Sequence, residues 1–283
     1  MKHDEGTLKT PAGASLYYQS WQPFDRPRAV LLIAHGLAEH SGRYQNFARF
    51  FVDRGYAVYA LDHSGHGKSD GDRCYIGRFS QFTDGVGLLL EKVREENPDS
   101  LVFLVGHSMG GLIATHFLIE HQSEFAGCVL SGAAVQPAVE VPALQRLTIR
   151  FFSIVLPKLG LLQLDASEIS RDPEVVDRYR NDPLVFTGKV SARLLEQFFG
   201  SMSGLEEKLA AIELPMLILH GSADGLVSPQ GSKMLHEKIG SGDKKLIIYE
   251  GLYHEIYNEP EQADVMTDVA DWLAPRLVSP AQS

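Results

Sequence analysis

Apolar residues occur along this chain in short continuous runs, separated by longer segments in which they recur at helical spacing. Continuous apolar runs of strand length are typical of strands that are buried on both faces, as in parallel sheets. The alternation therefore predicts an α/β protein with a mostly parallel eight-stranded sheet flanked by helices. The predicted strands are residues 6–10, 15–21, 28–34, 56–61, 101–105, 126–130, 215–220 and 244–250, and the predicted helices are residues 44–54, 79–96, 229–239, 261–277 and a segment directly after residue 108.

The alternation stops between residues 134 and 204, where helix-like segments follow one another without a convincing strand, broken up by five prolines. The strand pattern then resumes at residue 215. Because the chain returns to the sheet on both sides of this stretch, an insertion is favoured over a separate helical domain. We therefore predict a single domain over residues 1–283, in which residues 134–204 form a helical cap inserted after the sixth strand.

One predicted strand leads directly into the pentapeptide GHSMG at residues 106–110, and a helical pattern follows at once. In that context the motif G-x-S-x-G predicts a nucleophile elbow rather than an ordinary glycine-rich turn. Such a tight turn forces Ser108 into strained backbone angles, and Gly106 and Gly110 lack the Cβ atoms that would collide there. Ser108 is therefore the predicted nucleophile, in an α/β-hydrolase fold.

A serine hydroxyl needs a base to take its proton, and that base needs a carboxylate to orient it. In this fold the acid follows the serine along the chain and the histidine comes last. Asp224 and His254 each lie a few residues after a predicted strand. His220 and His236 compete with His254, but His220 ends its strand ahead of the acid and His236 falls within a surface helix. The predicted triad is Ser108, Asp224 and His254.

The tetrahedral intermediate of ester hydrolysis carries an oxyanion, which preorganised N–H groups must stabilise. One N–H belongs to the residue after the nucleophile, here Met109, and the other comes from the loop after the third strand. In that loop Gly36 allows a close turn, and the Leu37 N–H is the expected donor. The predicted oxyanion hole therefore uses only the backbone of Leu37 and Met109.

Composition excludes several classes of protein. The formal charge of −10 and the absence of basic runs argue against a nucleic-acid partner. Cys74 lies in a polar loop and Cys128 in a buried strand, which indicates neither a disulfide framework nor a zinc site. His63 and His66 form a potential metal pair but lack a third ligand. We expect no metal and no cofactor, and the lack of a signal or spanning segment favours a cytoplasmic enzyme.

Five segments together resemble the monoglyceride lipases, a group of α/β hydrolases whose bacterial members are often called lysophospholipases. They are HGLAEHSGRY at residues 35–44, DHSGHGKS at 62–69, GHSMGG at 106–111, GSAD at 221–224 and YEGLYH at 249–254. The resemblance extends over nearly the whole chain. It implies hydrolysis of monoacylglycerols to glycerol and fatty acid without a cofactor, through the triad and oxyanion hole named above.

The resemblance also implies that polar groups near the nucleophile hold the glycerol moiety. Arg43, His107 and Tyr179 occupy such positions, and Glu174 lies nearby in the cap. The cap departs from the mammalian pattern at one place, because residue 175 is a valine where that pattern has a glutamate.

Residues 141–156 place apolar groups more widely than one helix face requires. One interpretation is that these residues pack the cap onto the core. The other is an amphipathic lid that contacts a membrane or micelle and admits a fatty chain, which would make the enzyme peripheral at the membrane. Both can hold, because a helix has two faces.

Three rival functions remain open at this point. A lysophospholipase or a broad-specificity carboxylesterase would use the same chemistry on another substrate, and an acyltransferase or peptidase would use the same nucleophile. A ligand-binding homologue without turnover is the alternative from a different class. Epoxide hydrolases and haloalkane dehalogenases are excluded, because they use an aspartate at the elbow. The sequence does not indicate an oligomeric state.

Overall fold

An eight-stranded sheet forms the centre of the computed structural model, which describes residues 1–137 and 142–277. The strands are β1 (Lys2–Lys9), β2 (Ser15–Gln22), β3 (Val30–Ala34), β4 (Ala57–Leu61), β5 (Val102–His107), β6 (Gly127–Ser131), β9 (Met216–Gly221) and β10 (Lys244–Tyr249). Their order in the sheet is β1-β2-β4-β3-β5-β6-β9-β10. Only β2 pairs antiparallel with its neighbours, β1 and β4, and the remaining pairs are parallel. The predicted mostly parallel sheet is thus confirmed.

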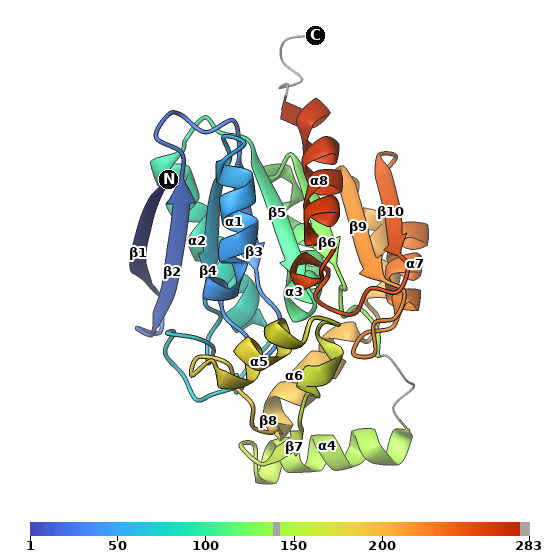
Figure 1. Cartoon of the computed structure of the whole chain (residues 1–283). Coiled ribbons are helices and arrows are strands. Elements are labelled where there is room, and N and C mark those ends of the chain that lie inside the picture. Colours follow the sequence, from blue (N-terminus) through green and yellow to red (C-terminus); the bar gives the residue numbers. More distant parts are fainter. Residues whose placement is uncertain (138–141, 278–283) are drawn as a thin grey trace.

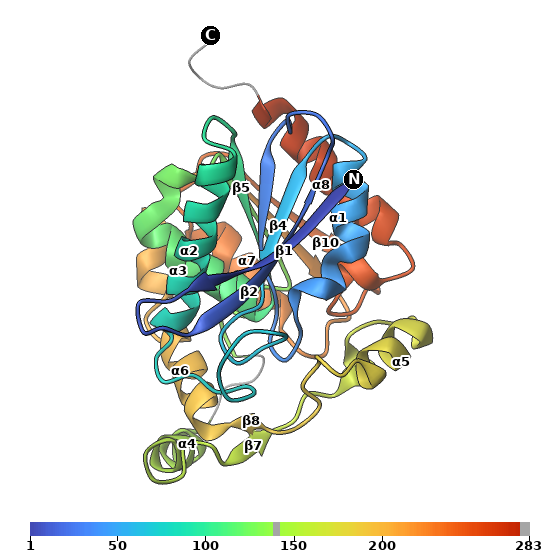
Figure 2. The ribbon, with the colours of Figure 1, turned by 90° about the vertical axis from the view of Figure 1, so that its left-hand side faces the viewer.

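Helices cover both faces of this sheet, α1 and α8 on one side and α2 and α3 on the other (Figure 2). They are α1 (Gln45–Val52), α2 (Ser80–Glu96), α3 (Met109–His121), α7 (Pro229–Lys238) and α8 (Gln262–Leu273), with short 3-10 helices η1 (Ser41–Tyr44), η2 (Gln122–Glu124), η4 (Glu206–Ala211), η5 (Ile256–Asn258) and η6 (Ala274–Leu277). Strand β3 shows why the sequence of a central strand is apolar at every position. Leu31 and Ile33 pack with one set of helices, whereas Leu32 packs with the other.

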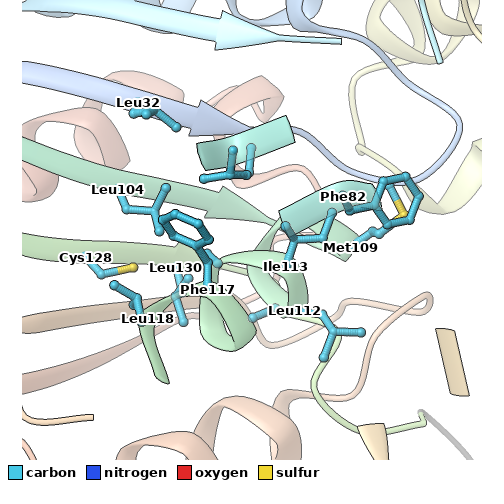
Figure 3. Packing of buried hydrophobic residues seen from close by; sticks show 14 of the residues in the cluster. Leu32, Phe82, Leu104, Met109, Leu112, Ile113, Phe117, Leu118, Cys128 and Leu130 are labelled. Carbon is cyan, nitrogen blue, oxygen red and sulfur yellow. The ribbon is translucent and has the colours of Figure 1, made fainter. Parts of the chain in front are cut away.

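Helix α3, which follows Ser108, is buried on almost every side. Phe117 packs beside Leu104 and Leu130 of the sheet, and Leu112 and Ile113 belong to the same buried cluster (Figure 3). Burying one such side chain fully contributes about 1.5–3 kcal/mol. The helix is therefore held firmly to the sheet, and so is the residue at its N-terminus.

The segment between β6 and β9 lies beyond the ends of the strands from which the loops after β3, β5 and β9 emerge (Figure 1). It contains α4 (Ala143–Val155), β7 (Gly160–Leu162), η3 (Ala166–Glu168), α5 (Pro173–Asn181), β8 (Val190–Ser191) and α6 (Ala192–Met202). Strands β7 and β8 pair antiparallel, so the expectation of a strand-free segment is wrong. These strands have three and two residues, too few to show an alternating pattern. Residues 138–141 of the predicted cap lie outside the described residues.

The first strand and the last helix have bounds that differ from the predicted ones. Strand β1 begins at Lys2, ahead of the predicted residue 6, and most of its residues are exposed. An edge strand without a buried face leaves no apolar pattern from which to predict its start. The last predicted helix, residues 261–277, divides into α8 and the 3-10 helix η6. Within the described ranges, no helix is both long and apolar enough to cross a bilayer.

Candidate active site

The turn between β5 and α3 has the strained geometry that the sequence predicts. Ser108 has φ 53° and ψ −118°, in a region that L-residues rarely adopt. A Cβ atom at Gly110 would lie 1.9 Å from the carbonyl oxygen of Ala34, and one at Gly106 would lie 2.7 Å from the carbonyl oxygen of Gly110. Both glycines are therefore required for the sheet and α3 to approach each other so closely.

Ser108 is fixed at the carboxyl end of β5 by backbone hydrogen bonds. Its N–H donates to the Ser131 carbonyl at 3.0 Å, and its carbonyl accepts from the Ala134 N–H at 3.1 Å. The residue is 9% exposed and lines a cavity. The N-terminus of α3 directly behind it favours negative charge. This combination of a fixed backbone, a cavity and a helix dipole suits a nucleophile.

Asp224 accepts hydrogen bonds on both carboxylate oxygens, and its side chain is fully buried. Its Oδ2 accepts from His254 Nδ1 at 2.6 Å, and its Oδ1 accepts from the N–H groups of Leu226 and Val227, each at 2.9 Å. Burial opposes the charge, but the neighbouring His254 and the hydrogen bonds together hold the pKa of Asp224 well below its usual range. The carboxylate is thus ionised and held in place to orient His254.

A second histidine, His220, also reaches Asp224. Its Nε2 lies 3.0 Å from Asp224 Oδ2 and 3.1 Å from the Val227 carbonyl oxygen, so this nitrogen faces two acceptors and carries the proton. Its Nδ1 lies 2.7 Å from Ser232 Oγ. The position of His220 at the end of a strand indicates burial but not the partner, so the sequence does not predict this contact. His220 therefore helps to hold the Asp224 carboxylate in place.

His254 is buried at the edge of the cavity, and its Nδ1 is engaged by Asp224. Burial lowers the pKa of His254, but the charge and hydrogen bond of Asp224 outweigh this, so the pKa is raised overall. The His107 ring lies beside it, with 4.8 Å between ring centroids. Burial, followed by the proximity of His254, lowers the pKa of His107 to about 4, so His107 is neutral.

The two predicted oxyanion donors come from segments that adjoin Ser108. Met109 is the first residue of α3, and the first N–H groups of a helix have no partner within it. Leu37 lines the cavity together with Ser108. A Cβ atom at the preceding Gly36 would lie 3.2 Å from Ser108 Cβ, so this loop passes directly beside the nucleophile. The arrangement can hold an oxyanion with backbone groups.

The cavity that contains Ser108 and His254 has a volume of about 300 Å³. Much of its wall is apolar and comes from the segment between β6 and β9, including Leu162, Leu164, Ile169, Leu195, Phe198 and Phe199. Near Ser108 the wall becomes polar, with Glu39, His107, Tyr179 and Glu255. The cavity wall therefore has an apolar part, which comes largely from the inserted segment, and a polar part close to Ser108.

The structure brings two of the four expected glycerol contacts to this cavity. His107 and Tyr179 line it, whereas the Glu174 side chain is 83% exposed on α5 and lies 3.6 Å from Arg178. Val175, which replaces the glutamate of the mammalian pattern, is buried in an apolar cluster of the inserted segment. The backbone at this position thus directs residue 175 inward and Glu174 toward solvent.

Arg43, the remaining expected contact, lies behind the cavity wall rather than in it. It is buried between Glu39 and Glu255, with N–O distances of 2.5–2.8 Å. Neither carboxylate is among the site residues predicted from the sequence. Glu39 lies inside the segment HGLAEHSGRY and Glu255 directly follows YEGLYH, but no local pattern indicates that a loop after β3 and a loop after β10 share one arginine.

Two other sequence features belong to the core of the molecule. His63 and His66 pack with His35 and Phe82 in a buried aromatic cluster. Cys74, expected in a polar loop, is completely buried, and burial raises its pKa to about 12. In the described part of the chain, no three His, Cys, Asp or Glu side chains are grouped so that they could hold a metal ion.

Known proteins with similar sequences and structures include several monoacylglycerol lipases. Residues 25–261 match the family model described as Serine aminopeptidase, S33. The chain is 37% identical to a monoacylglycerol lipase of Mycolicibacterium smegmatis over 94% of its own length and 95% of that protein. It is 36% identical to the monoglyceride lipase of Homo sapiens, covering 94% and 89% of the two chains. A crystal structure of a Paleococcus ferrophilus monoacylglycerol lipase superposes with a TM-score of 0.81 at 29% identity, covering 98% and 100%.

Proposed function

The chain belongs to the family described as Serine aminopeptidase, S33, and within it we propose that this enzyme hydrolyses monoacylglycerols to glycerol and free fatty acid. The observation that carries the proposal is the site itself. Ser108 on its strained turn shares one cavity with His254, and His254 is hydrogen-bonded to the buried carboxylate of Asp224. The relatives named above supply the substrate class.

The reaction follows from the polarity of these groups. Ser108 Oγ attacks the ester carbonyl carbon while its proton passes to His254 Nε2, the ring nitrogen that Asp224 leaves free. The N–H groups of Leu37 and Met109 stabilise the oxyanion. The C–O bond to glycerol then breaks, and His254 returns the proton to the leaving alkoxide. Water attacks the acyl-enzyme in the same way, which releases the fatty acid and restores the Ser108 hydroxyl.

The charge of the polar part of the cavity favours a neutral alcohol as leaving group. Glu39 and Glu255 lie there, and no lysine or arginine is among the described residues that line the cavity. Arg43, behind the wall, pairs with both carboxylates but offsets only one of their two negative charges, so the phosphate of a lysophospholipid would meet a net negative charge. Glycerol carries only hydroxyl groups, which His107 and Tyr179 can hydrogen-bond.

A substrate panel tests this choice directly. We expect kcat/KM to be higher for a monoacylglycerol than for lysophosphatidylcholine and lysophosphatidic acid with the same acyl chain, with the largest deficit for lysophosphatidic acid, which has the higher negative charge. Comparable rates on all three would favour the lysophospholipase alternative. Preference for short nitrophenyl esters over every lipid would favour a broad carboxylesterase. Failure of a fluorophosphonate to label the protein would favour a ligand-binding homologue.

We also propose that residues 134–204 act as a cap that contacts lipid aggregates. Helix α4 exposes Leu144, Leu147, Phe151 and Ile154, with exposed fractions of 77%, 62%, 57% and 71%. A helix with an apolar face of this kind can lie in the membrane interface. The four side chains lie on one helix and form a larger exposed apolar surface than a single exposed residue such as Phe24 does.

Vesicle flotation tests the contact. We expect the wild-type chain to float with lipid vesicles and the double variant Leu147→Gln with Ile154→Gln to remain at the bottom of the gradient. Hydrolysis of a dissolved nitrophenyl acetate by that variant should stay unchanged. Phe24→Gln, which removes an equally exposed apolar group elsewhere, is the matched control and should still float. No flotation of the wild type, with full activity on micelles, would contradict the proposal.

A further inference from the structure

A buried carboxylate holds the loop that carries the predicted oxyanion donor Leu37. Glu39 Oε1 accepts the Gly36 N–H at 2.6 Å and the Tyr44 hydroxyl at 2.8 Å. Its other oxygen, Oε2, accepts from Arg43 Nη1 at 2.8 Å. The hydrogen bond between Gly36 and Glu39 closes a short loop that contains Leu37 and Ala38. The Leu37 N–H is therefore held inside this loop.

The backbone inside this bond is strained. Ala38 has φ 66°, an angle that a residue with a side chain adopts only where the surroundings impose it. Two contacts impose it here. The Glu39 side chain closes the loop onto Gly36, and the Ala38 carbonyl accepts the Phe186 N–H at 2.8 Å. A Cβ atom at Gly36 would lie 2.8 Å from Glu39 Oε1 and 3.2 Å from Ser108 Cβ, so a larger residue here would displace the Glu39 side chain.

Arg43 connects this loop to the loop that carries His254. Its Nη1 and Nη2 donate to the two oxygens of Glu255, at 2.5 and 2.6 Å, while Nη1 also donates to Glu39. Glu255 directly follows His254 and is further held by Asn258 Nδ2 at 2.8 Å. The Tyr179 ring covers the guanidinium, 4.7 Å from ring centroid to Cζ. A paired arrangement of this kind fixes geometry as well as charge.

From these contacts we propose that Glu39 positions the oxyanion hole, and that Arg43 couples this loop to the base through Glu255. Both are positioning residues, since they act on the reacting atoms through the Leu37 peptide and through His254. The proposal rests on the serine-hydrolase chemistry proposed above, but not on the identity of the ester. It assigns Arg43 a role different from the glycerol contact that the sequence predicts.

Glu39→Ala removes the acceptor that holds Gly36. We expect kcat per active site to fall by about 10²-fold, as for the loss of one oxyanion donor, while KM stays within about threefold. Active sites are counted by fluorophosphonate titration, so misfolded protein does not enter the rate. The affinity for an alkyl boronic acid, whose tetrahedral adduct places an oxygen in the oxyanion hole, should fall by a similar factor. Affinity for a fatty alcohol, which carries no charge and forms no adduct, should not change.

Two further variants separate positioning from folding. Glu39→Gln keeps the volume, but its amide can accept from Gly36 or from Arg43 and not from both, so we expect a smaller loss. It also removes a negative charge that raises the pKa of His254, so the acid limb of the kcat/KM profile should move to lower pH. Tyr44→Phe removes a neighbouring donor and leaves the Gly36 bond, so its rate should stay within about threefold of wild type.

The proposal fails if kcat per titrated site and boronate affinity in Glu39→Ala stay near wild type. If that variant does not fold, Glu39→Gln decides, and an unchanged rate together with an unmoved acid limb overturns the proposal. Failure of the proposed function looks different, because the wild-type chain would then not react with the fluorophosphonate.

Discussion

Both oxygens of the Asp224 carboxylate accept hydrogen bonds, and replacing Asp224 with asparagine turns one of these acceptors into an NH₂ donor. Oδ1 accepts two backbone N–H groups and Oδ2 faces the ring nitrogens of His254 and His220. In either orientation the new amide points its NH₂ at two donors. Backbone N–H groups cannot give up their protons, whereas an imidazole can move its proton to the other nitrogen. The amide NH₂ should therefore face the histidines.

The consequence for catalysis is a wrong tautomer. His254 would accept on Nδ1 and carry its proton on Nε2, where it can no longer take the proton of Ser108. A change of this kind lowers kcat by about 10⁴-fold in a serine hydrolase of another fold. At about 1.36 kcal/mol for each tenfold change, this corresponds to roughly 5 kcal/mol of transition-state stabilisation. Substrate binding does not use Asp224, so KM should change little.

The assay is kcat and KM for a nitrophenyl ester from acid to alkaline pH, for wild type, Asp224→Asn and the control Asp177→Asn on the exposed face of α5. Loss of the carboxylate charge also lowers the pKa of His254, so the acid limb should move to lower pH. Intact mass must be checked, because asparagine before Gly225 deamidates readily and restores the carboxylate. A variant of correct mass with a rate within about tenfold of wild type would refute the reasoning.

Three further outcomes follow from the packing and charge of single residues. Gly110→Ala should abolish or strongly reduce folded protein, because the new Cβ atom would lie 1.9 Å from the Ala34 carbonyl oxygen. A Cβ atom at Gly87 in α2 would meet no atom closer than 3.7 Å, so Gly87→Ala should raise the free energy of unfolding in urea titrations by up to about 1 kcal/mol. Burial lowers the pKa of His107 in the folded protein to about 4, whereas a histidine in the unfolded chain has its ordinary pKa of 6.5. Between these values the unfolded chain binds more protons, so the urea midpoint should fall as pH drops through this range, and proton uptake should accompany unfolding. Glu174→Ala should leave KM for a monoacylglycerol within about twofold, because this side chain points to solvent; a large rise would mean that α5 rearranges around substrate.

Local patterns were sufficient to predict the framework. Strands buried on both faces are recognisable from composition alone, and β3, β4, β5, β6 and β9 are all of this type. The elbow is equally local, because the strain at Ser108 and the close contact at Gly110 arise within a few residues. The positions of Asp224 and His254 after strands follow from the topology, which brings the ends of parallel strands to one edge.

What the sequence could not indicate depends on contacts between distant segments. The interaction of His220 with Asp224 requires the particular turn that the chain takes after β9. The pairing of Arg43 with Glu255 joins residues more than two hundred positions apart, and the burial of Cys74 results from packing around its loop. Strand pairs as short as β7 and β8 carry no periodic signal at all. In each case the residue type was visible, but its partner was not.

The most direct measurement compares the wild-type chain with Ser108→Ala on one monoacylglycerol, with product release and covalent labelling followed in the same samples. The wild type should release glycerol and fatty acid in equal amounts, and a fluorophosphonate should add one adduct to the peptide that contains Ser108. Ser108→Ala should keep its melting temperature, lose the adduct and lose turnover by about 10⁶-fold. Comparable hydrolysis by that variant, or an adduct on a different residue, would contradict the assignment of Ser108 as the nucleophile.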